Sequence, residues 1–288
     1  MESISLAVNG RTDIGQVREE NEDSIHCYSD SETDFAYVVV ADGMGGYSGG
    51  AVASRITVDT LKEHLDELVN GTFLACSPQQ QQLMLRACLL DSCAIANQKI
   101  LEAKSLRPQF SHMGTTLVAA VIWQNFLIVA HVGDSRAYLW NEYGLQRLTR
   151  DHSVVQEMID RGQLTPEQAQ TSQVRNHITR ALGVENQVDV TINSWNLTEN
   201  ALLLLCSDGL TEYLDDSTIE RILATHRPAL ECVYRFIDDA NQCGGRDNIS
   251  AGIIEYCNRA QSAAALSDDA ITLRPANRED TTQRKVHR

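Results

Sequence analysis

Five short acidic clusters are spaced along the chain, each close to the end of an apolar run and most of them beside glycine. They are Glu22-Asp23, Asp42-Gly43, Asp134 in HVGDSR, Asp208-Gly209 in CSDGL and Asp247 in GGRDNIS. If several strand ends bring these carboxylates to one place, they repel each other unless a cation lies among them. Hard divalent cations prefer oxygen ligands. The pattern therefore predicts a site for more than one metal ion, of the kind that hydrolases use.

The composition argues against several other classes of protein. A chain of 288 residues is long enough for one large domain or two small ones, and 43% hydrophobic with 22% charged residues is typical of a soluble globular protein. The net charge of −15 argues against a nucleic-acid partner, because phosphate backbones require basic surface. The longest apolar runs, such as 117–123, are too short to span a membrane, so no membrane association is expected.

The cysteines and the first residues of the chain indicate in which cellular compartment the protein is expected. Eight cysteines are scattered singly without a CxxC pair, so neither a zinc ribbon nor a disulfide framework is indicated. Cys88 and Cys93 lie in an expected helix and are interpreted as core thiols. The start of the chain lacks the basic and apolar stretches of a signal peptide. We therefore expect a reducing, cytoplasmic location.

Apolar periodicity predicts a mixture of helices and antiparallel strands. The run 35–40 is typical of a buried strand, and helices are expected over about 50–69 and 78–104. In the second helix, the apolar positions at helical spacing are Leu83, Ala87, Leu90 and Ala94. These four residues are expected to form its buried face.

Short turn segments then predict two hairpins. Gln124-Asn125 separates one pair of strand patterns, and residues 142–144 separate the next. Strand patterns return at VDVTINSW and ALLLLCSD, followed by two helices and a last strand, NISAGIIEYC. Strands in hairpins and helices in pairs indicate antiparallel sheets rather than a βαβ repeat. The polar segment 151–183 is interpreted as a surface insertion, and residues 258–288 as a disordered tail.

Eight ordered motifs extend over most of the chain. They are VREENEDS, ADGMGG, MGTT, HVGDSRAY, LTRDHS, ITRALG, CSDGL and GGRDNIS. In order and spacing they resemble the bacterial metal-dependent protein phosphatases, the PPM or type 2C family, over about residues 5–257. The resemblance implies an α+β fold, an α-β-β-α sandwich of two antiparallel sheets flanked by paired helices. It also implies one catalytic domain over 1–257, with a flap at about 151–183.

The resemblance further implies a division of labour among the acidic residues. Two core ions, Mn²⁺ or Mg²⁺, would share Asp42, and a weaker third ion is expected. The Gly43 carbonyl would complete one coordination sphere, and Asp208 and Asp247 would hold the other metal. Asp134 would help to bind the third ion with Asp208. Asp23 and Glu22 would act through bound waters. Asp23 is counted with the metal ligands, and Glu22 lies in the outer shell.

Arg18 matches the family arginine that binds the substrate phosphate, and its planar fork suits two phosphate oxygens. The implied reaction is hydrolysis of phosphoserine and phosphothreonine in proteins by a metal-bridging hydroxide. The implied partners are a bacterial serine/threonine kinase and its substrates, and the protein is expected to be a monomer. Met44 stands where the animal enzymes carry a histidine proposed as general acid, and a thioether cannot donate a proton.

Other polar residues near the motifs receive plainer interpretations. His152 is interpreted as a loop or cap histidine rather than an acid, and His131 as a hydrogen-bonded core residue. Thr115 and Thr116 are expected to pack and form hydrogen bonds near the site rather than act as nucleophiles.

Two alternative functions stay open. One is a phosphatase that acts on a single dedicated partner, such as an anti-anti-sigma factor. The other is an inactive regulator that binds phosphoproteins, against which the intact Asp42, Asp208 and Asp247 argue.

Overall fold

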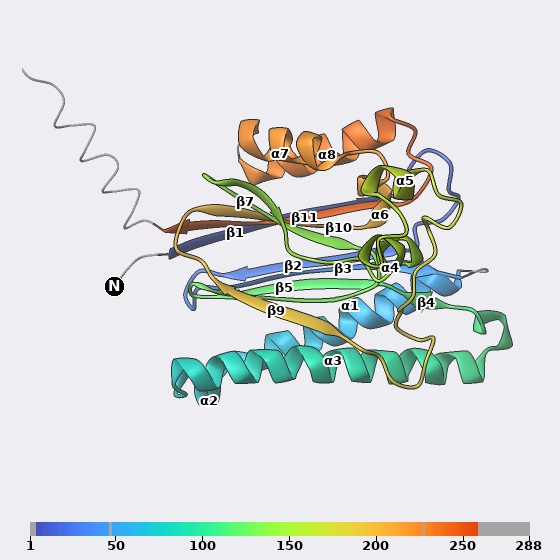
Figure 1. Cartoon of the computed structure of the whole chain (residues 1–288). Coiled ribbons are helices and arrows are strands. Elements are labelled where there is room, and N and C mark those ends of the chain that lie inside the picture. The colour runs from blue at the N-terminus through green and yellow to red at the C-terminus, as the bar shows by residue number, and fades with distance from the viewer. Residues whose placement is uncertain (1–3, 46–47, 227, 259–288) are drawn as a thin grey trace, which may run out of the picture.

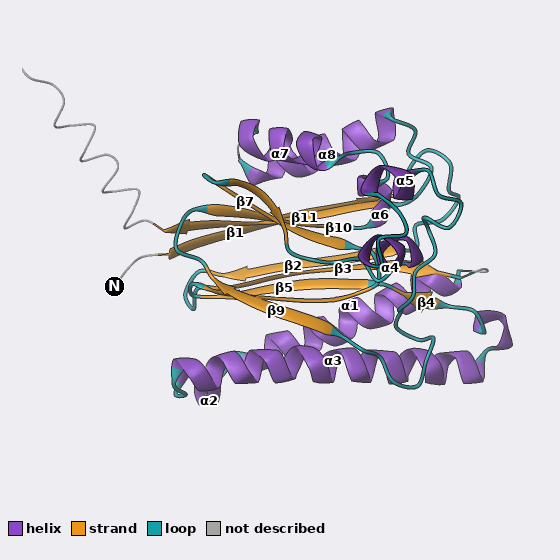
Figure 2. Cartoon of the chain, in the orientation of Figure 1, coloured by secondary structure: helices purple, strands orange, loops and turns teal. Residues whose placement is uncertain are grey.

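Two antiparallel sheets are stacked face to face, and helices cover both outer faces (Figure 1). The computed structural model describes residues 4–45, 48–226 and 228–258. Figure 2 shows the resulting layers of helix, sheet, sheet and helix. The predicted α-β-β-α sandwich is therefore confirmed. No helix among the described residues is both long and apolar enough to cross a membrane.

The first sheet has the strand order β1-β11-β10-β7-β8. Its strands are β1 (Ile4–Asp13), β11 (Ile249–Asn258), β10 (Ala201–Cys206), β7 (Arg136–Asn141) and β8 (Gly144–Arg147). Its outer face is covered by α7 (Asp216–Thr225) and α8 (Ala229–Gln242), and α6 (Asp208–Thr211) follows β10 directly. β1 pairs with β11 along its whole length, which joins the two ends of the described chain.

The second sheet has the order β2-β3-β5-β6-β9, with a short additional strand, β4, beside β3. Its strands are β2 (Asp23–Asp30), β3 (Phe35–Met44), β4 (Gly114–Thr115), β5 (Leu117–Trp123), β6 (Phe126–Val132) and β9 (Thr191–Asn196). Its outer face is covered by α1 (Gly49–Leu68) and α3 (Pro78–Leu106). The short helix α2 (Gly71–Leu74) precedes α3, and a 3-10 turn (Pro108–Phe110) follows it.

The unbroken apolar sequence of β3 follows from burial on both faces. Val38 and Val40 belong to the core between the two sheets, whereas Tyr37 and Val39 belong to the core under α1 and α3. A strand that is covered on both sides needs no polar alternation. The central strands therefore form a rigid support whose ends carry the acidic clusters.

The predicted buried face of α3 is wrong. Leu83 is 66% exposed and Leu90 is 39% exposed, and Ala87 and Ala94 are exposed as well. The residues that face the core are Gln81, Leu85, Leu89, Ser92, Cys93, Ala96, Asn97 and Ile100. The buried stripe includes polar side chains, so a pattern that counts only apolar residues selects the wrong side.

Hydrogen bonds explain why two of those polar side chains are buried. Gln81 donates from Nε2 to the Phe73 carbonyl and accepts from the Trp123 indole nitrogen. Asn97 donates to the Glu185 carbonyl and accepts from the Gly183 amide. Buried polar groups with such partners carry little penalty.

The two predicted hairpins are present as β5–β6 and β7–β8. The expected insertion contains the short helices α4 (Val154–Asp160) and α5 (Pro166–Gln170); residues 151–183 are called the flap below. Strands β1 and β2 were not predicted. The expected tail lies outside the described residues except for Asn258, which belongs to β11.

Candidate metal centre

Four of the predicted carboxylates lie where strands from both sheets end or begin. Asp42 lies near the end of β3 and Asp134 follows β6. Asp208 opens α6 just after β10, and Asp247 lies two residues before the start of β11. In Figure 1, these strand ends lie at the end of the sandwich that also carries α4, α5 and α6. The fold thus gathers residues that are more than 200 positions apart in the sequence.

Asp42 lies at the centre of the acidic group. Burial raises the pKa of its carboxyl well above the usual range, and the charges of Asp23, Asp208 and Asp134 raise it further. Its carboxyl also shares a hydrogen bond with that of Asp208. The backbone around it is fixed, because the Thr116 amide donates to the Asp42 carbonyl at 2.9 Å and the Thr116 hydroxyl accepts from the Asp42 amide at 3.1 Å.

Thr115 completes this support by donating its hydroxyl to the same Asp42 carbonyl at 2.8 Å. Both threonines therefore act on the backbone that carries the carboxylate. The prediction that Thr115 and Thr116 pack and form hydrogen bonds near the site is confirmed.

The pKa values of the neighbouring carboxyls are raised for the same reasons. Burial and the charge of Asp208 raise the pKa of Asp134 to about 8. Burial, followed by the charge of Asp247, raises the pKa of Asp208. Several carboxyls are thus held where ionisation of all of them is unfavourable without added positive charge. A cluster of divalent cations would supply that charge.

Asp23 begins β2 and Glu22 precedes it, beside Asp42 and Gly43 of β3. Asp23 is the ladder partner of Asp42, is 6% exposed, and accepts hydrogen bonds from the hydroxyls of Ser207 at 2.8 Å and Ser250 at 2.7 Å. Burial raises its pKa to about 7 despite these bonds. Glu22 accepts from the Gly50 amide at 3.0 Å.

Gly43 leaves room for close packing of two chain segments. A Cβ atom at this position would lie 2.2 Å from the Gly50 carbonyl oxygen and 2.5 Å from that of Glu22. Any side chain would therefore separate β3 from the start of α1. The position requires glycine, whose backbone carbonyl is the ligand that the resemblance implies.

Arg18 approaches the acidic group from the loop between β1 and β2. Its Nη2 donates to Asp247 Oδ2 at 2.7 Å, and its side chain is 48% exposed. The hydrogen bond with Asp247 raises the pKa of Arg18, although burial opposes the change. Asn248 holds the same loop, because its Nδ2 donates to the carbonyls of Ile14 and Glu20 at 3.0 Å. The guanidinium is therefore held at the site and stays accessible to a ligand.

The donor set fits hard divalent cations. It consists of carboxylates and one glycine carbonyl, the oxygen ligands that Mg²⁺ and Mn²⁺ favour. Within the described ranges, no three acidic, histidine or cysteine side chains are arranged as a ready metal-binding group. Three carboxyls instead take part in two contacts with other site residues, Asp42 with Asp208 and Asp247 with Arg18. Bound ions would have to replace these two contacts.

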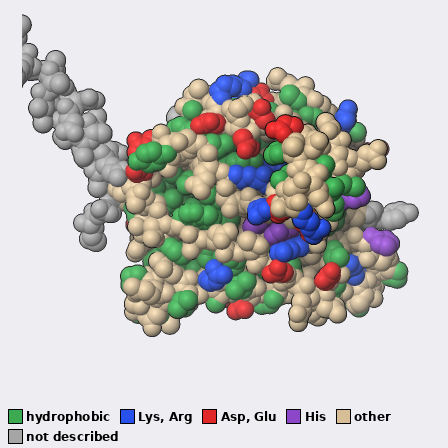
Figure 3. Space-filling view, viewed as in Figure 1, with side chains coloured by type: hydrophobic (Ala, Val, Ile, Leu, Met, Phe, Trp, Pro, Cys, Tyr) green, Lys and Arg blue, Asp and Glu red, His purple; other side chains and the backbone are tan. Residues whose placement is uncertain are grey.

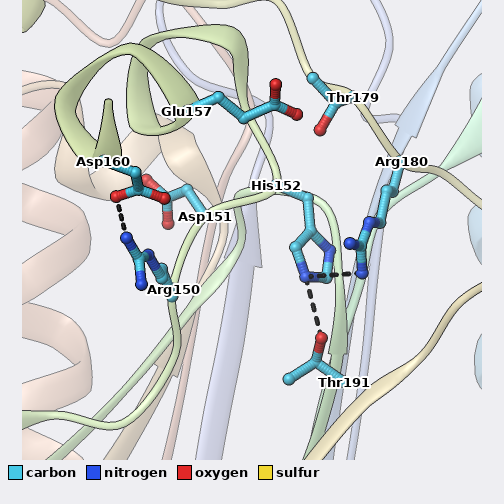
Figure 4. A pocket seen from close by; sticks show the side chains of 8 residues that line it. All are labelled: Arg150, Asp151, His152, Glu157, Asp160, Thr179, Arg180 and Thr191. Atoms are coloured by element: carbon cyan, nitrogen blue, oxygen red, sulfur yellow. Dashed lines mark hydrogen bonds and ion pairs between the residues drawn. The ribbon is translucent and has the colours of Figure 1, made fainter. Parts of the chain in front are cut away.

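The two histidines have structural contacts, as predicted. His131 is 1% exposed, bonds to the Arg150 carbonyl and stacks on His152 at 4.6 Å between ring centroids. His152 Nδ1 accepts from the Gly133 amide, and burial lowers its pKa to about 4. Figure 4 shows its other nitrogen beside Thr191 and Arg180. His152 therefore anchors the base of the flap.

A groove of about 820 Å³ runs from Asp134 and Asp208 along the flap. Its far wall is formed by residues of the α6–α7 region such as Glu212, which forms an ion pair with Arg175 of the flap at 3.1 Å. Figure 3 shows Lys, Arg and His side chains gathered on this face near α4. A chain segment attached to a group at the metal centre could lie in this groove.

Sequence reasoning missed the residues that support the carboxylates. Ser207, Asn248 and Ser250 lie inside the quoted motifs CSDGL and GGRDNIS, so their positions were visible. Their roles depend on hydrogen bonds across the two sheets, which the motifs do not reveal.

Comparisons with known proteins identify relatives over most of the chain. A family model described as "Protein phosphatase 2C" matches residues 15–249. The serine/threonine phosphatase Stp of Listeria monocytogenes is 36% identical over 245 residues, covering 85% of this chain and 94% of the relative. The serine/threonine protein phosphatase PstP of Mycobacterium tuberculosis is 33% identical over 280 residues, covering 94% of this chain and 50% of the relative.

Solved structures show the same fold. The serine/threonine phosphatase Stp1 of Staphylococcus aureus matches with a TM-score of 0.78 and 30% identity, covering 87% of this chain and 95% of that one. The catalytic domain of PstP, solved with two manganese ions, matches with a TM-score of 0.74 and 32% identity, covering 88% and 99%.

Proposed function

This chain belongs to the protein phosphatase 2C family, and we infer that it is a protein-serine/threonine phosphatase whose acidic centre binds Mn²⁺ or Mg²⁺. The observation that carries the metal dependence is the group of carboxyls around Asp42, whose pKa values are raised by burial and by one another. The manganese ions bound to the related PstP domain support the choice of metal.

We propose that Asp42 contacts both core ions, that Asp208 and Asp247 hold one of them, and that the Gly43 carbonyl serves the other. Asp134 would contribute to a weaker third ion. When bound, such ions activate a water molecule as nucleophile and neutralise charge on the phosphate.

The other residues of the site support this arrangement. Thr115 and Thr116 hold the backbone of Asp42, and the serines that bond to Asp23 hold that carboxyl in place beside it. Glu22 and Asp23 would act through water molecules. These contacts fix the carboxylates before any ligand arrives, which limits the reorganisation that catalysis requires.

Arg18 would bind the phosphate of the substrate. Its guanidinium is half-exposed and already bonded to one carboxylate of the centre. A planar fork with several donors can contact two phosphate oxygens in one plane, a fixed geometry that a lysine ammonium does not provide. Met44 has no proton to give, so protonation of the leaving serine or threonine must involve another group.

The proposed biological role is to oppose a serine/threonine kinase in the cytoplasm by dephosphorylating its protein substrates. The names of the relatives support phosphoprotein substrates. The intact acidic centre argues against an inactive phosphoprotein-binding regulator.

Hydrolysis of a phosphothreonine peptide with and without Mn²⁺ tests the proposal. We expect turnover that depends on Mn²⁺, is abolished by a chelator, and is much weaker on the matching phosphotyrosine peptide. Asp59→Asn serves as a control, because Asp59 is exposed on α1. It should behave as wild type. Binding of the phosphopeptide without any Mn²⁺-dependent release of phosphate would instead identify a regulator.

A further inference from the structure

A cluster of charged residues beside the centre has no role in the proposed chemistry. Arg136 donates from Nε to both oxygens of Asp151 at 3.2 Å and from Nη2 to Oδ2 at 2.8 Å. Arg147 pairs with the same carboxylate from β8. The Asp151 side chain is 9% exposed, so the pair is largely removed from solvent. Arg136 and Asp151 come from the motifs HVGDSR and LTRDHS.

Arg136 connects this cluster to two carboxylates of the centre. It lies two residues after Asp134, and its ladder partner in β10 is Cys206, which lies two residues before Asp208. Because β7 and β10 are antiparallel, both carboxylates leave the sheet at the same end. The placement of Arg136 therefore affects how Asp134 lies relative to Asp208.

Asp151 connects the cluster to the base of the flap. Its neighbour His152 donates its backbone amide to the Gly133 carbonyl at 2.8 Å, and His152 Nδ1 accepts from the Gly133 amide at 3.2 Å. Ser135 bonds to Thr116 at 2.7 Å on the other side of this turn. The turn that carries Asp134 is thus fixed between the flap base and the support of Asp42.

The geometry of the pair depends on the arginine fork. Two guanidinium nitrogens contact one carboxylate, which fixes both the distance and the plane of the two groups. Arg136 Nη1 also donates to the Tyr138 hydroxyl at 3.3 Å, and this hydroxyl donates to Asp216 at 3.1 Å. A lysine would keep the positive charge, but it could not form the planar two-nitrogen contact with the carboxylate.

We propose that Arg136 and Asp151 form a positioning pair, which holds Asp134 beside Asp208 and ties the base of the flap to that carboxylate. The inference rests on the proposed function, because Asp134 and Asp208 are the residues assigned to the weaker third ion. Neither member of the pair needs to contact the substrate. A conformational change at the flap base would then move Asp134 through this pair and so alter the affinity for the third ion.

Asp151→Asn and Arg136→Lys test the pair in the full-length protein. Calorimetric titration with Mn²⁺ should show the weakest ion bound about 10–100-fold less tightly in Asp151→Asn, the range expected when a group that orients a ligand is lost. Arg136→Lys should lie between Asp151→Asn and wild type. The two tighter ions should keep their affinities.

A second measurement needs neither metal nor activity. In the metal-free protein, hydrogen exchange at the amides of Gly133, His152 and Thr179 should be faster in both variants, because these amides bond across the flap base. Glu167→Gln is the matched control, since Glu167 is exposed on α5 of the flap. It should change neither exchange nor Mn²⁺ binding.

Circular dichroism first establishes that each variant folds, and Arg136→Lys carries the test if Asp151→Asn does not. Unchanged affinity for the weakest ion, or loss of the two tighter ions as well, would overturn the positioning role. So would wild-type exchange at the flap base. A wild-type protein without Mn²⁺-dependent phosphatase activity would refute the proposed function instead, whatever the variants show.

Discussion

Asp23 offers a test of whether ionisation of the acidic centre destabilises the fold when no cations are bound. Burial raises the pKa of this carboxyl to about 7, the Ser250 and Ser207 hydroxyls oppose the change, and the charges of Asp208 and Asp247 add to it. In an unfolded chain the same carboxyl titrates near 3.8. Folding at a pH between these values therefore takes up a proton.

The size of the effect follows from this difference. A group whose pKa is raised on folding adds stability that is complete below the unfolded value and is lost as the pH rises through the folded value. The difference between 3.8 and about 7 is about three units, which corresponds to roughly 4 kcal/mol. Between pH 5 and pH 7, about 2–3 kcal/mol of this should be lost.

Urea unfolding of the metal-free protein from pH 5 to pH 8 measures the loss. Asp23→Asn has nearly the same shape, and its amide oxygen can still accept from both serines, but it does not titrate. The variant should therefore lose about 2–3 kcal/mol less than wild type over this range. Asp59→Asn on exposed α1 should follow wild type. Equal pH dependence in wild type and Asp23→Asn would refute the electrostatic reasoning.

Three further predictions concern the centre and the core. Asp42→Asn and Asp208→Asn should each lower phosphopeptide turnover by at least ~10²–10³, the effect of losing one electrostatic stabiliser, and near-normal rates in folded variants would contradict their assignment. Arg18→Ala should raise KM for phosphopeptide with little change in calorimetric Mn²⁺ affinity, and Arg18→Lys should restore only part of the binding; equal damage to metal binding would indicate a structural role. Leu89→Ala should lower the free energy of unfolding by about 2–5 kcal/mol because Leu89 is fully buried, whereas Leu90→Ala should cost much less, and equal losses in urea unfolding would contradict the observed orientation of α3.

The apolar pattern predicted antiparallel sheets and carboxylates at strand ends for a physical reason, whereas the α-β-β-α sandwich was implied by the resemblance to the family. Asp42 and Asp208 follow continuous apolar runs, and such runs mark buried strands whose ends must leave the core. The structure places both residues in one group, as expected.

What the sequence did not predict depends on contacts between distant segments. β1 is only partly buried, and its partner β11 begins more than 200 residues later, so no local pattern reveals the pairing. The wrong face of α3 has the same origin. Gln81 and Asn97 are buried because they bond to Trp123 and to the segment after the flap, and neither contact can be inferred from helical periodicity.

The most direct test of the metal centre is anomalous diffraction from crystals of the wild-type protein grown with Mn²⁺. We expect two strong peaks that share the Asp42 carboxylate, with Asp208 and Asp247 at one peak and the Gly43 carbonyl at the other. Manganese peaks only at other carboxylates, with none within ligand distance of Asp42, would show that Asp42 is not a metal ligand.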